Sequence, residues 1–189
     1  MSSPNRIGLY GGTFDPIHTG HLHVIQQLFT RNIVDELVLV PAGEPWLRSR
    51  TPYASGDDRF AMAQLAVKEL PANIRTRVTV SDIEVRRAGS TYTIDTVLEL
   101  QMERPDAQWI LILGTDAYED IEQWHRSAEL QAIIEILVVA REGKGLDIKA
   151  LPISASQIRA QIQREPDEVK DIPDSVWTYI KERHLYASK

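Results

Sequence analysis

Short, largely apolar runs recur along the chain, separated by longer stretches in which apolar residues keep helical spacing. The strand-length runs lie at residues 7–10, 37–40, 109–113 and 136–140. Runs of this kind are typical of strands buried on both faces of a parallel sheet. After the first run, the sequence has helical spacing, which puts one set of apolar residues on a single face: Leu22, Ile25, Leu28 and Phe29. Strands that alternate with helices predict an α/β fold with a doubly wound parallel sheet.

Weaker patterns predict further elements in the middle of the chain. Val78–Val85 alternates as a strand would, and Ser55 is suited to cap a helix from about residue 57 to 69. Residues 87–96 pass from a turn into another helix. Its buried side is predicted to carry Ile94, Val97, Leu98 and Met102.

The C-terminal segment predicts a closing helix over residues 172–186, with Pro173 in its first turn. Val176, Trp177 and Ile180 would face the body of the protein. Because no repeat, low-complexity tract or linker interrupts the sequence, residues 1–189 are expected to form one domain. A small helical appendage at about 154–189 would complete it.

Composition excludes several classes of function. The 21 Lys and Arg against 27 Asp and Glu give a net charge of −6, which argues against non-specific nucleic-acid binding. Without cysteine there is no disulfide, no thiolate nucleophile and no sulfur metal site. The first residues lack the apolar core of a signal peptide, and no apolar run is long enough to span a membrane. We therefore expect a cytoplasmic protein without a membrane partner, as a monomer or a homo-oligomer.

The chain from Gly8 to Leu22 combines a glycine turn with two histidines at a helix start. Gly11 and Gly12 would let backbone N–H groups approach a ligand closely. A helix beginning at residue 19 or 20 would carry His18 and His21 on one side of its first turn. A helix N-terminus attracts anions, and imidazoles add directional donors. The pattern is therefore suited to a polyphosphate.

Other interpretations of this stretch compete with a phosphate site. The glycine pair could form a plain tight turn. His18 and His21 could bind zinc, although the remaining histidines show no ligand spacing. The glycines do not match the Gly-x-Gly-x-x-Gly dinucleotide pattern, and no Lys-Ser or Lys-Thr follows them as a Walker motif requires.

Two later stretches carry further candidate chemistry. Gly114 and Asp116 follow the strand at 109–113, and the tips at Gly11 and Gly114 would flank the crevice where strand order reverses. Asp116 could equally cap a helix. Ser154 is placed as an N-cap with Ser156 in the first turn and Arg159 in the second. Taken alone, that segment would be a capped amphipathic helix with a solvated arginine.

Gly11-Gly-Thr-Phe-Asp-Pro-Ile-His-Thr-Gly-His21 resembles the signature of nucleotidyltransferases with a His-x-Gly-His motif. Its Gly-Gly-Thr-Phe-Asp-Pro form is similar to that of bacterial nicotinate mononucleotide adenylyltransferases. Pro152–Arg159 resembles that family's late Ile-Ser-x-Thr/Ser-x-x-Arg element. The resemblance implies a Rossmann-like nucleotidyltransferase fold and transfer of AMP from ATP to nicotinate mononucleotide. Magnesium would arrive with ATP, since it usually keeps waters and binds phosphates.

The resemblance also implies roles for individual residues. Those expected to be catalytic are His18, His21 and Arg159. Those expected to bind ATP are Gly11, Gly12, Thr13, Phe14, His18, His21, Gly114, Asp116, Ile153, Ser154, Ser156 and Arg159. Those expected to bind the mononucleotide are Arg48, Thr91, Tyr92, Thr93, Asp116 and Trp124. No residue is expected to bind a metal directly.

Some of these assignments have ordinary structural alternatives. Arg48 lies in the polar segment Glu44–Pro52 and could simply be solvated. A threonine at a helix entry is usually a cap, and a lone tryptophan usually packs. The family's Ser/Thr-Tyr-Thr motif and its tryptophan instead imply that Thr91–Thr93 and Trp124 meet the pyridine ring.

Three other functions stay open from the sequence. Pantetheine-phosphate adenylyltransferases resemble the chain at Gly-x-Phe-Asp-Pro but usually carry threonine where His18 stands. Nicotinamide mononucleotide is an alternative acceptor, because stacking does not distinguish acid from amide. A non-catalytic nucleotide sensor is the third. The chain also departs from its relatives at Ser90, where many have proline, and in a shorter segment after Arg141, which leaves the wall beside adenine undefined.

Overall fold

The computed structural model describes residues 4–45, 51–140, 145–149, 151–166 and 169–187. The main sheet contains β1 (Arg6–Gly12), β2 (Glu36–Pro41), β4 (Val78–Val80), β6 (Gln108–Gly114), β7 (Glu135–Ala140) and β8 (Leu146–Asp147). A small second sheet pairs β3 (Glu44–Pro45) with β5 (Ser90–Thr91). The helices are α1 (Thr19–Thr30), α2 (Gly56–Lys68), α3 (Ala72–Arg75), α4 (Ile83–Arg86), α5 (Thr93–Glu103), α6 (Thr115–Glu119), η1 (Ile121–Gln123), α7 (Ser127–Ile133), α8 (Ala155–Arg164) and α9 (Asp174–Glu182).

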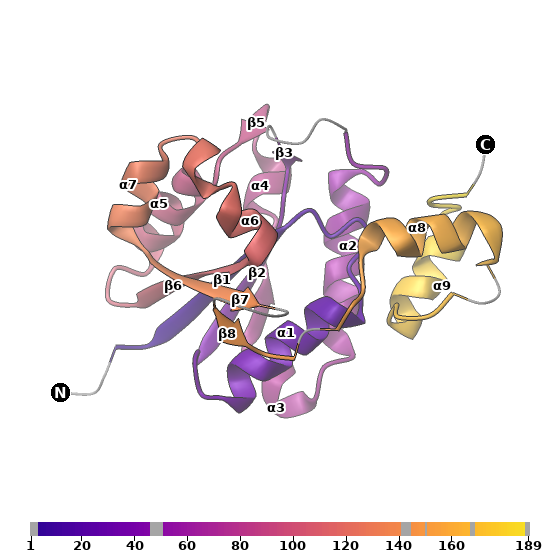
Figure 1. Ribbon diagram of the computed structural model, residues 1–189, viewed down its shortest axis with the longest axis horizontal. Helices are drawn as coiled ribbons and strands as arrows, with labels where there is room; N and C mark the ends of the chain where they lie inside the picture. The colour runs from indigo at the N-terminus through magenta and orange to yellow at the C-terminus, as the bar shows by residue number, and fades with distance from the viewer. Residues whose placement is uncertain (1–3, 46–50, 141–144, 150, 167–168, 188–189) are drawn as a thin grey trace.

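The main sheet has the strand order β4-β2-β1-β6-β7-β8, and every pairing between its described strands is parallel. From β1 the chain builds outward through β2 to β4, and from β6 it builds the other way through β7 to β8. Strand order therefore reverses between β1 and β6, which lie side by side (Figure 1). The prediction of a doubly wound parallel α/β sheet is confirmed.

Alternate residues of the central strands enter two separate cores, as a sheet covered on both faces requires. Ile110 and Ile112 of β6 pack in the core that includes buried residues of α1 and α2. Leu111 and Leu113 pack in the other core, with residues of α5 and α7. Figure 1 shows these two helix pairs on opposite sides of the sheet.

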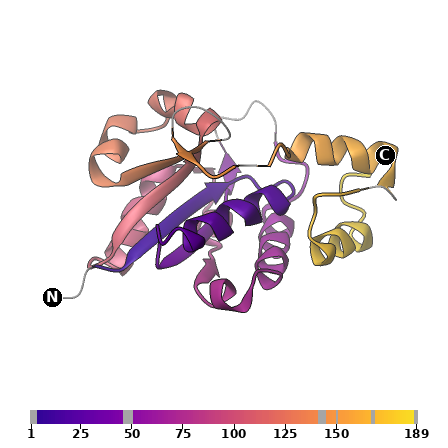
Figure 2. The ribbon, with the colours of Figure 1, turned by 60° about the horizontal axis from the view of Figure 1, so that its bottom comes forward.

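The C-terminal helices lie at one side of the molecule, beyond α2 (Figures 1 and 2). Val176 and Ile180 of α9 are buried in the core shared with α1 and α2, and Trp177 is partly buried against it, as the sequence predicted. The Ser175 backbone N–H donates to the Glu69 carboxylate at 2.7 Å. These contacts fix α9 against α2.

Several element boundaries differ from the sequence predictions. The strand predicted over Val78–Val85 ends at Val80 and gives way to α4, which begins at Ile83. Met102 is 82 % exposed, so its predicted burial is wrong; Leu100 occupies the buried side instead. The closing helix spans only Asp174–Glu182, and Pro173 is its N-cap residue. The strands β3, β5 and β8 were not predicted, because each contains only two residues.

None of the helices in the described ranges is long and apolar enough to cross a membrane. Most of residues 141–145, where the chain is shorter than its relatives, lies outside the described residues, and the short strand β8 follows directly.

Asp58 of α2 joins the N-terminus of its own helix to α9. Its carboxylate accepts hydrogen bonds from the hydroxyls of Ser55 and Tyr179 and from the Arg183 guanidinium, at 2.6, 2.9 and 3.1 Å. Burial, the largest single influence, would raise the pKa of Asp58, but these hydrogen bonds together hold that pKa below its ordinary value. The charged carboxylate therefore stabilises the folded chain.

Replacing Asp58 by asparagine should lower the free energy of unfolding by about 1–2 kcal/mol at pH 7, because hydrogen bonds to a charged acceptor are lost. A carboxylate with a depressed folded pKa stabilises the protein above its unfolded pKa of about 3.9, and loses this effect as pH falls through the folded pKa. The difference between wild type and Asp58→Asn should therefore shrink below about pH 4. Denaturant unfolding at pH 7 and pH 3 measures it; an equal difference at both pH values would contradict the assignment.

Candidate functional site

The turn after β1 places a phenylalanine ring directly over a glycine. Phe14 has a φ of +50°, and a Cβ built on Gly12 would lie 2.8 Å from the Phe14 ring. Any side chain at Gly12 would displace that ring. A Cβ built on Gly11 would meet none of the described atoms within 4 Å. The glycine turn is thus closed on one side by Phe14 and open at Gly11.

The two histidines stand at the start of α1. His18 is the N-cap residue rather than part of the first turn, and His21 is the third residue of the helix. Their rings stack with centroids 3.7 Å apart and planes at 24°. The His18 backbone N–H donates to His21 Nδ1 at 3.1 Å. When the Nδ1 atom of a neutral imidazole accepts, Nε2 carries the hydrogen, so His21 presents an Nε2–H donor.

The Phe14 ring also supports His21. The two rings meet edge to face with centroids 5.0 Å apart, and Tyr10 meets Phe14 in the same way at 5.7 Å. Tyr10 is buried, and burial raises the pKa of its hydroxyl well above the ordinary value. The turn, the β1 strand and the histidine therefore form one packed aromatic group.

A second helix start lies against the first. Ser154 is the N-cap of α8 and accepts from the Gln157 backbone N–H at 3.3 Å, while Ser156 is exposed in the first turn. Ile153 is buried, and a Cβ built on Gly20 of α1 would lie 3.6 Å from it. The late motif thus packs on the beginning of α1.

Arg159 connects the late motif to the early one. Its Nη1 atom donates to the Asp15 backbone carbonyl at 2.5 Å and lies 4.0 Å from the Asp15 carboxylate. The guanidinium also covers the Tyr53 ring, 4.6 Å from the centroid. An arginine has five N–H donors in a fixed fork, so one such bond holds its orientation without using its whole capacity. Two motifs separated by more than a hundred residues therefore meet.

Asp15 is a buried residue that sequence reasoning did not select. Its carboxylate accepts from the backbone N–H groups of Tyr53 and Ala54 at 2.8 and 3.1 Å, and from the Tyr186 hydroxyl at 2.8 Å. Burial, together with the neighbouring Asp15 charge, raises the pKa of Tyr186. Asp15 thereby holds the early motif to the segment before α2 and to the C-terminal residues. Its signal in the sequence was its place inside the Phe-Asp-Pro motif.

The end of β6 lies at the same sheet edge as the glycine turn. Tyr10 pairs with Ile112, so Gly12 and Gly114, each two residues further on, come to one edge. A Cβ built on Gly114 would meet no described atom within 4 Å. Asp116 follows in the first turn of α6 and is exposed. The predicted pair of tips is therefore adjacent at the point where strand order reverses.

The segments predicted to bind the pyridine ring also meet one another. Tyr92, the N-cap residue of α5, contacts the His125 ring, with centroids 4.2 Å apart and planes tilted by 33°. Arg126 pairs with Asp95 of α5 at 3.3 Å. Trp124 is partly buried and packs against the core beneath α5 and α7. Trp124 therefore lies beside the helix entry that contains Thr93, the first residue of α5.

Arg48 and Thr91 are two of the residues predicted to contact the mononucleotide. Arg48 lies outside the described residues. Thr91 is buried, and its hydroxyl has no hydrogen-bond partner within the part of the chain that the structure describes. Its methyl group would lie 2.7 Å from a Cβ on Gly43, so its side chain faces the end of β2.

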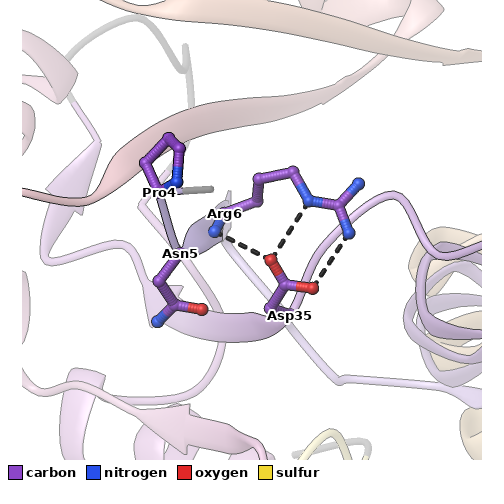
Figure 3. Close-up of a pocket in the computed structure, with 4 residues that line it drawn as sticks. All are labelled: Pro4, Asn5, Arg6 and Asp35. Carbon is purple, nitrogen blue, oxygen red and sulfur yellow. Dashed lines mark hydrogen bonds and ion pairs between the residues drawn. The ribbon is translucent and has the colours of Figure 1, made fainter. Parts of the chain in front are cut away.

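Within the described ranges, no group of three or more His, Cys, Asp or Glu side chains is placed to hold a metal ion. A surface hollow lined by Pro4, Asn5, Arg6 and Asp35 lies at the opposite, amino-terminal edge of β1 (Figure 3). There the Arg6 guanidinium donates to Asp35 at 2.9 and 3.1 Å and lowers the pKa of that carboxyl. Its charged groups are paired with each other, so the candidate site remains the carboxyl-terminal edge.

Known proteins resemble this chain in sequence and in fold. Residues 9–161 match the cytidylyltransferase-like family. The chain is 34 % identical to a probable nicotinate-nucleotide adenylyltransferase of Synechococcus sp. (strain JA-3-3Ab), over 98 % of this chain and 99 % of that protein. It is 36 % identical to one of Streptomyces coelicolor, over 95 % of this chain and 100 % of the relative. A Plasmodium falciparum nicotinic acid mononucleotide adenylyltransferase complexed with NaAD shares the fold, with a TM-score of 0.80 at 23 % identity, covering 96 % and 97 % of the two chains.

Proposed function

Because the chain belongs to the nicotinate-nucleotide adenylyltransferases of the cytidylyltransferase-like family, we propose that it transfers the adenylyl group of ATP to nicotinate mononucleotide. The products are nicotinate adenine dinucleotide, a precursor of NAD, and pyrophosphate. The observation that carries this proposal for the chain's own residues is the contact between Arg159 and Asp15. That contact joins the start of α8 to the turn before α1, so two anion-attracting helix N-termini face one region.

The reaction needs positioning and charge stabilisation rather than a covalent enzyme intermediate. A phosphate oxygen of the mononucleotide attacks the α-phosphorus of ATP, a new P–O–P bridge forms, and the bond to the β-phosphate breaks. For such in-line displacements the protein holds both reactants and stabilises the charge that spreads over the phosphate oxygens. An Nε2–H donor on His21 is suited to that task.

Each group at the edge has a place in this scheme. His18 and His21 contact the α and β phosphates, and the backbone of Thr13 and Phe14 donates from the glycine turn. The leaving pyrophosphate is bound by Ser154, Ser156 and Arg159. Gly11 and Gly114 leave room for the nucleotide, Gly12 admits the Phe14 ring that supports the turn, and Ile153 supports the second helix start.

A divalent cation, which we take to be Mg²⁺, enters with ATP and neutralises charge on its phosphates. A cation that arrives with ATP is held mainly by phosphate and water. Asp116, exposed in the first turn of α6, would contact either a metal-bound water or the sugar hydroxyls of the substrate. ATP and mononucleotides are cytoplasmic metabolites, which supports the cytoplasm as the place of action.

The acceptor lies where the Tyr92 and Trp124 segments meet. Backbone N–H groups at the start of α5, from Thr91 to Thr93, are suited to a pyridine carboxylate, and Trp124 supplies a face for the ring. Arg48 would reach the phosphate of the mononucleotide. The Tyr92–His125 and Asp95–Arg126 contacts hold these two segments together.

Trp124→Ala should raise the KM for nicotinate mononucleotide by about 5- to 150-fold, because ring stacking on an aromatic side chain is worth on the order of 1–3 kcal/mol. The KM for ATP should change less than about threefold, since the ring does not touch ATP. Steady-state kinetics with each substrate varied in turn measure both values. A variant in which the two KM values rise together would place Trp124 outside the acceptor site.

Pyrophosphate release from ATP, measured with each candidate acceptor, tests the function itself. Nicotinate mononucleotide should support release at a higher kcat/KM than nicotinamide mononucleotide or phosphopantetheine. Release that is fastest with phosphopantetheine would identify a different adenylyltransferase. Binding of ATP without release for any acceptor would identify a nucleotide sensor.

A further inference from the structure

Arg59 of α2 is a buried arginine, 1 % exposed, whose guanidinium lies beneath the loops of the candidate site. It donates to three backbone carbonyl oxygens: that of Thr13 at 2.9 Å, that of Gly43 at 2.9 Å and that of Ala54 at 3.3 Å. We propose that Arg59 is a positioning residue that sets the backbone of the phosphate-binding turn. This inference rests on the proposed function, since it concerns how that same site holds ATP.

The geometry of the peptide bond links Arg59 to the ligand side of the turn. In a trans peptide, the carbonyl of one residue and the N–H of the next point in opposite directions within one plane. Holding the Thr13 carbonyl against the guanidinium therefore turns the Phe14 N–H away from it. Phe14 is the residue with a φ of +50°, a backbone conformation that requires support in a residue other than glycine.

The same guanidinium fixes two neighbouring loops. Gly43 follows β2, whose last residue pairs with Gly12 of the turn, and the Ala42 N–H donates to the Gly12 carbonyl at 2.8 Å. Ala54 also donates its N–H to the Asp15 carboxylate at 3.1 Å. Arg59 therefore lies where the ends of β1 and β2 and the segment before α2 converge, directly behind the turn that carries Thr13 and Phe14.

A lysine at position 59 could not make these three contacts. Three carbonyls from three separate segments need donors that diverge from a rigid plane, which a guanidinium provides and a single ammonium nitrogen does not. The Arg59 side chain is also almost completely buried, at 1 % exposure. Arg59→Lys keeps the positive charge and most of the volume, so it tests the forked arrangement of guanidinium N–H donors by itself.

The test compares Arg59→Lys with Met62→Ala. Met62 is a fully buried residue of the same helix without an N–H donor in its side chain, so its truncation destabilises α2 but releases no carbonyl. Melting temperatures of both variants are measured first, and ATP affinity is then measured by calorimetry well below the lower one. Hydrogen exchange of the segment containing Phe14 is followed in the same proteins.

Arg59→Lys should weaken ATP binding at least about tenfold and accelerate exchange around Phe14, whereas Met62→Ala should change ATP affinity less than about threefold. Equal ATP affinities in the two variants, or wild-type affinity in Arg59→Lys, would overturn the inference. ATP affinity does not depend on the acceptor. If the wild type bound ATP but released no pyrophosphate with nicotinate mononucleotide, only the proposed function would be contradicted. If Arg59→Lys bound ATP as tightly as the wild type, only the Arg59 inference would be contradicted.

Discussion

Replacing His21 by alanine is expected to lower the turnover number at least about a hundredfold, because a donor aimed at transition-state charge is lost. The reason is local. The His18 N–H donates to Nδ1 of His21, so Nε2 carries the hydrogen, and the Phe14 ring packs edge to face against the imidazole. Steady-state measurement of pyrophosphate release gives kcat directly. Asparagine at this position should recover part of the loss, since its amide also donates.

His23→Ala is the matched control on the same helix. His23 lies two residues further along α1, and its Nε2 contacts the Ile148 carbonyl at 2.9 Å, away from the glycine turn. Its removal should reduce stability and leave kcat within about threefold of the wild type. Near-wild-type turnover in His21→Ala, or an equal loss in both variants, would refute the role given to His21.

Arg159→Ala should reduce kcat/KM for ATP by about a hundredfold to a thousandfold, since a cationic donor to the leaving pyrophosphate is lost. Arg159→Lys should recover only part of this, because an ammonium cannot make the planar, forked contacts of a guanidinium. Arg159 also connects Asp15 to α8, so the alanine variant loses a contact between the two motifs.

Arg164→Ala tests whether ATP binding depends on the place of Arg159 or only on the positive charge of α8. Arg164 lies at the end of the same helix and is exposed. If the cationic character of α8 alone attracted ATP, both alanine variants would raise the KM for ATP similarly at low salt. We expect Arg164→Ala to behave as the wild type within about twofold. Similar losses in the two variants would contradict a direct contact between Arg159 and pyrophosphate.

The central strands and both chemical motifs could be predicted from the sequence because their signals are local. A buried parallel strand is a short apolar run, and a helix start is an N-cap residue such as Ser154. The doubly wound parallel sheet followed from the alternation of elements and from the resemblance. The extent of the domain and the homo-oligomeric state stay predictions.

Tertiary contacts decided the remaining features. Met102 fits the apolar spacing of α5, yet its side chain is exposed, because none of the described elements covers the helix there. β3 and β5 consist of two residues each, which is too short for a periodic signal. Asp15 contacts Ala54, 39 positions away, and Arg59 contacts Thr13, 46 positions away, so hydrophobic periodicity does not indicate either residue.

The central claim is that the starts of α1 and α8 bind one triphosphate between them. A crystal structure with an ATP analogue that cannot be cleaved between the α and β phosphates tests it most directly. The account predicts phosphate oxygens within hydrogen-bond distance of both His21 Nε2 and the Arg159 guanidinium. A triphosphate bound elsewhere, or one that contacts only one of these two helix starts, would contradict it.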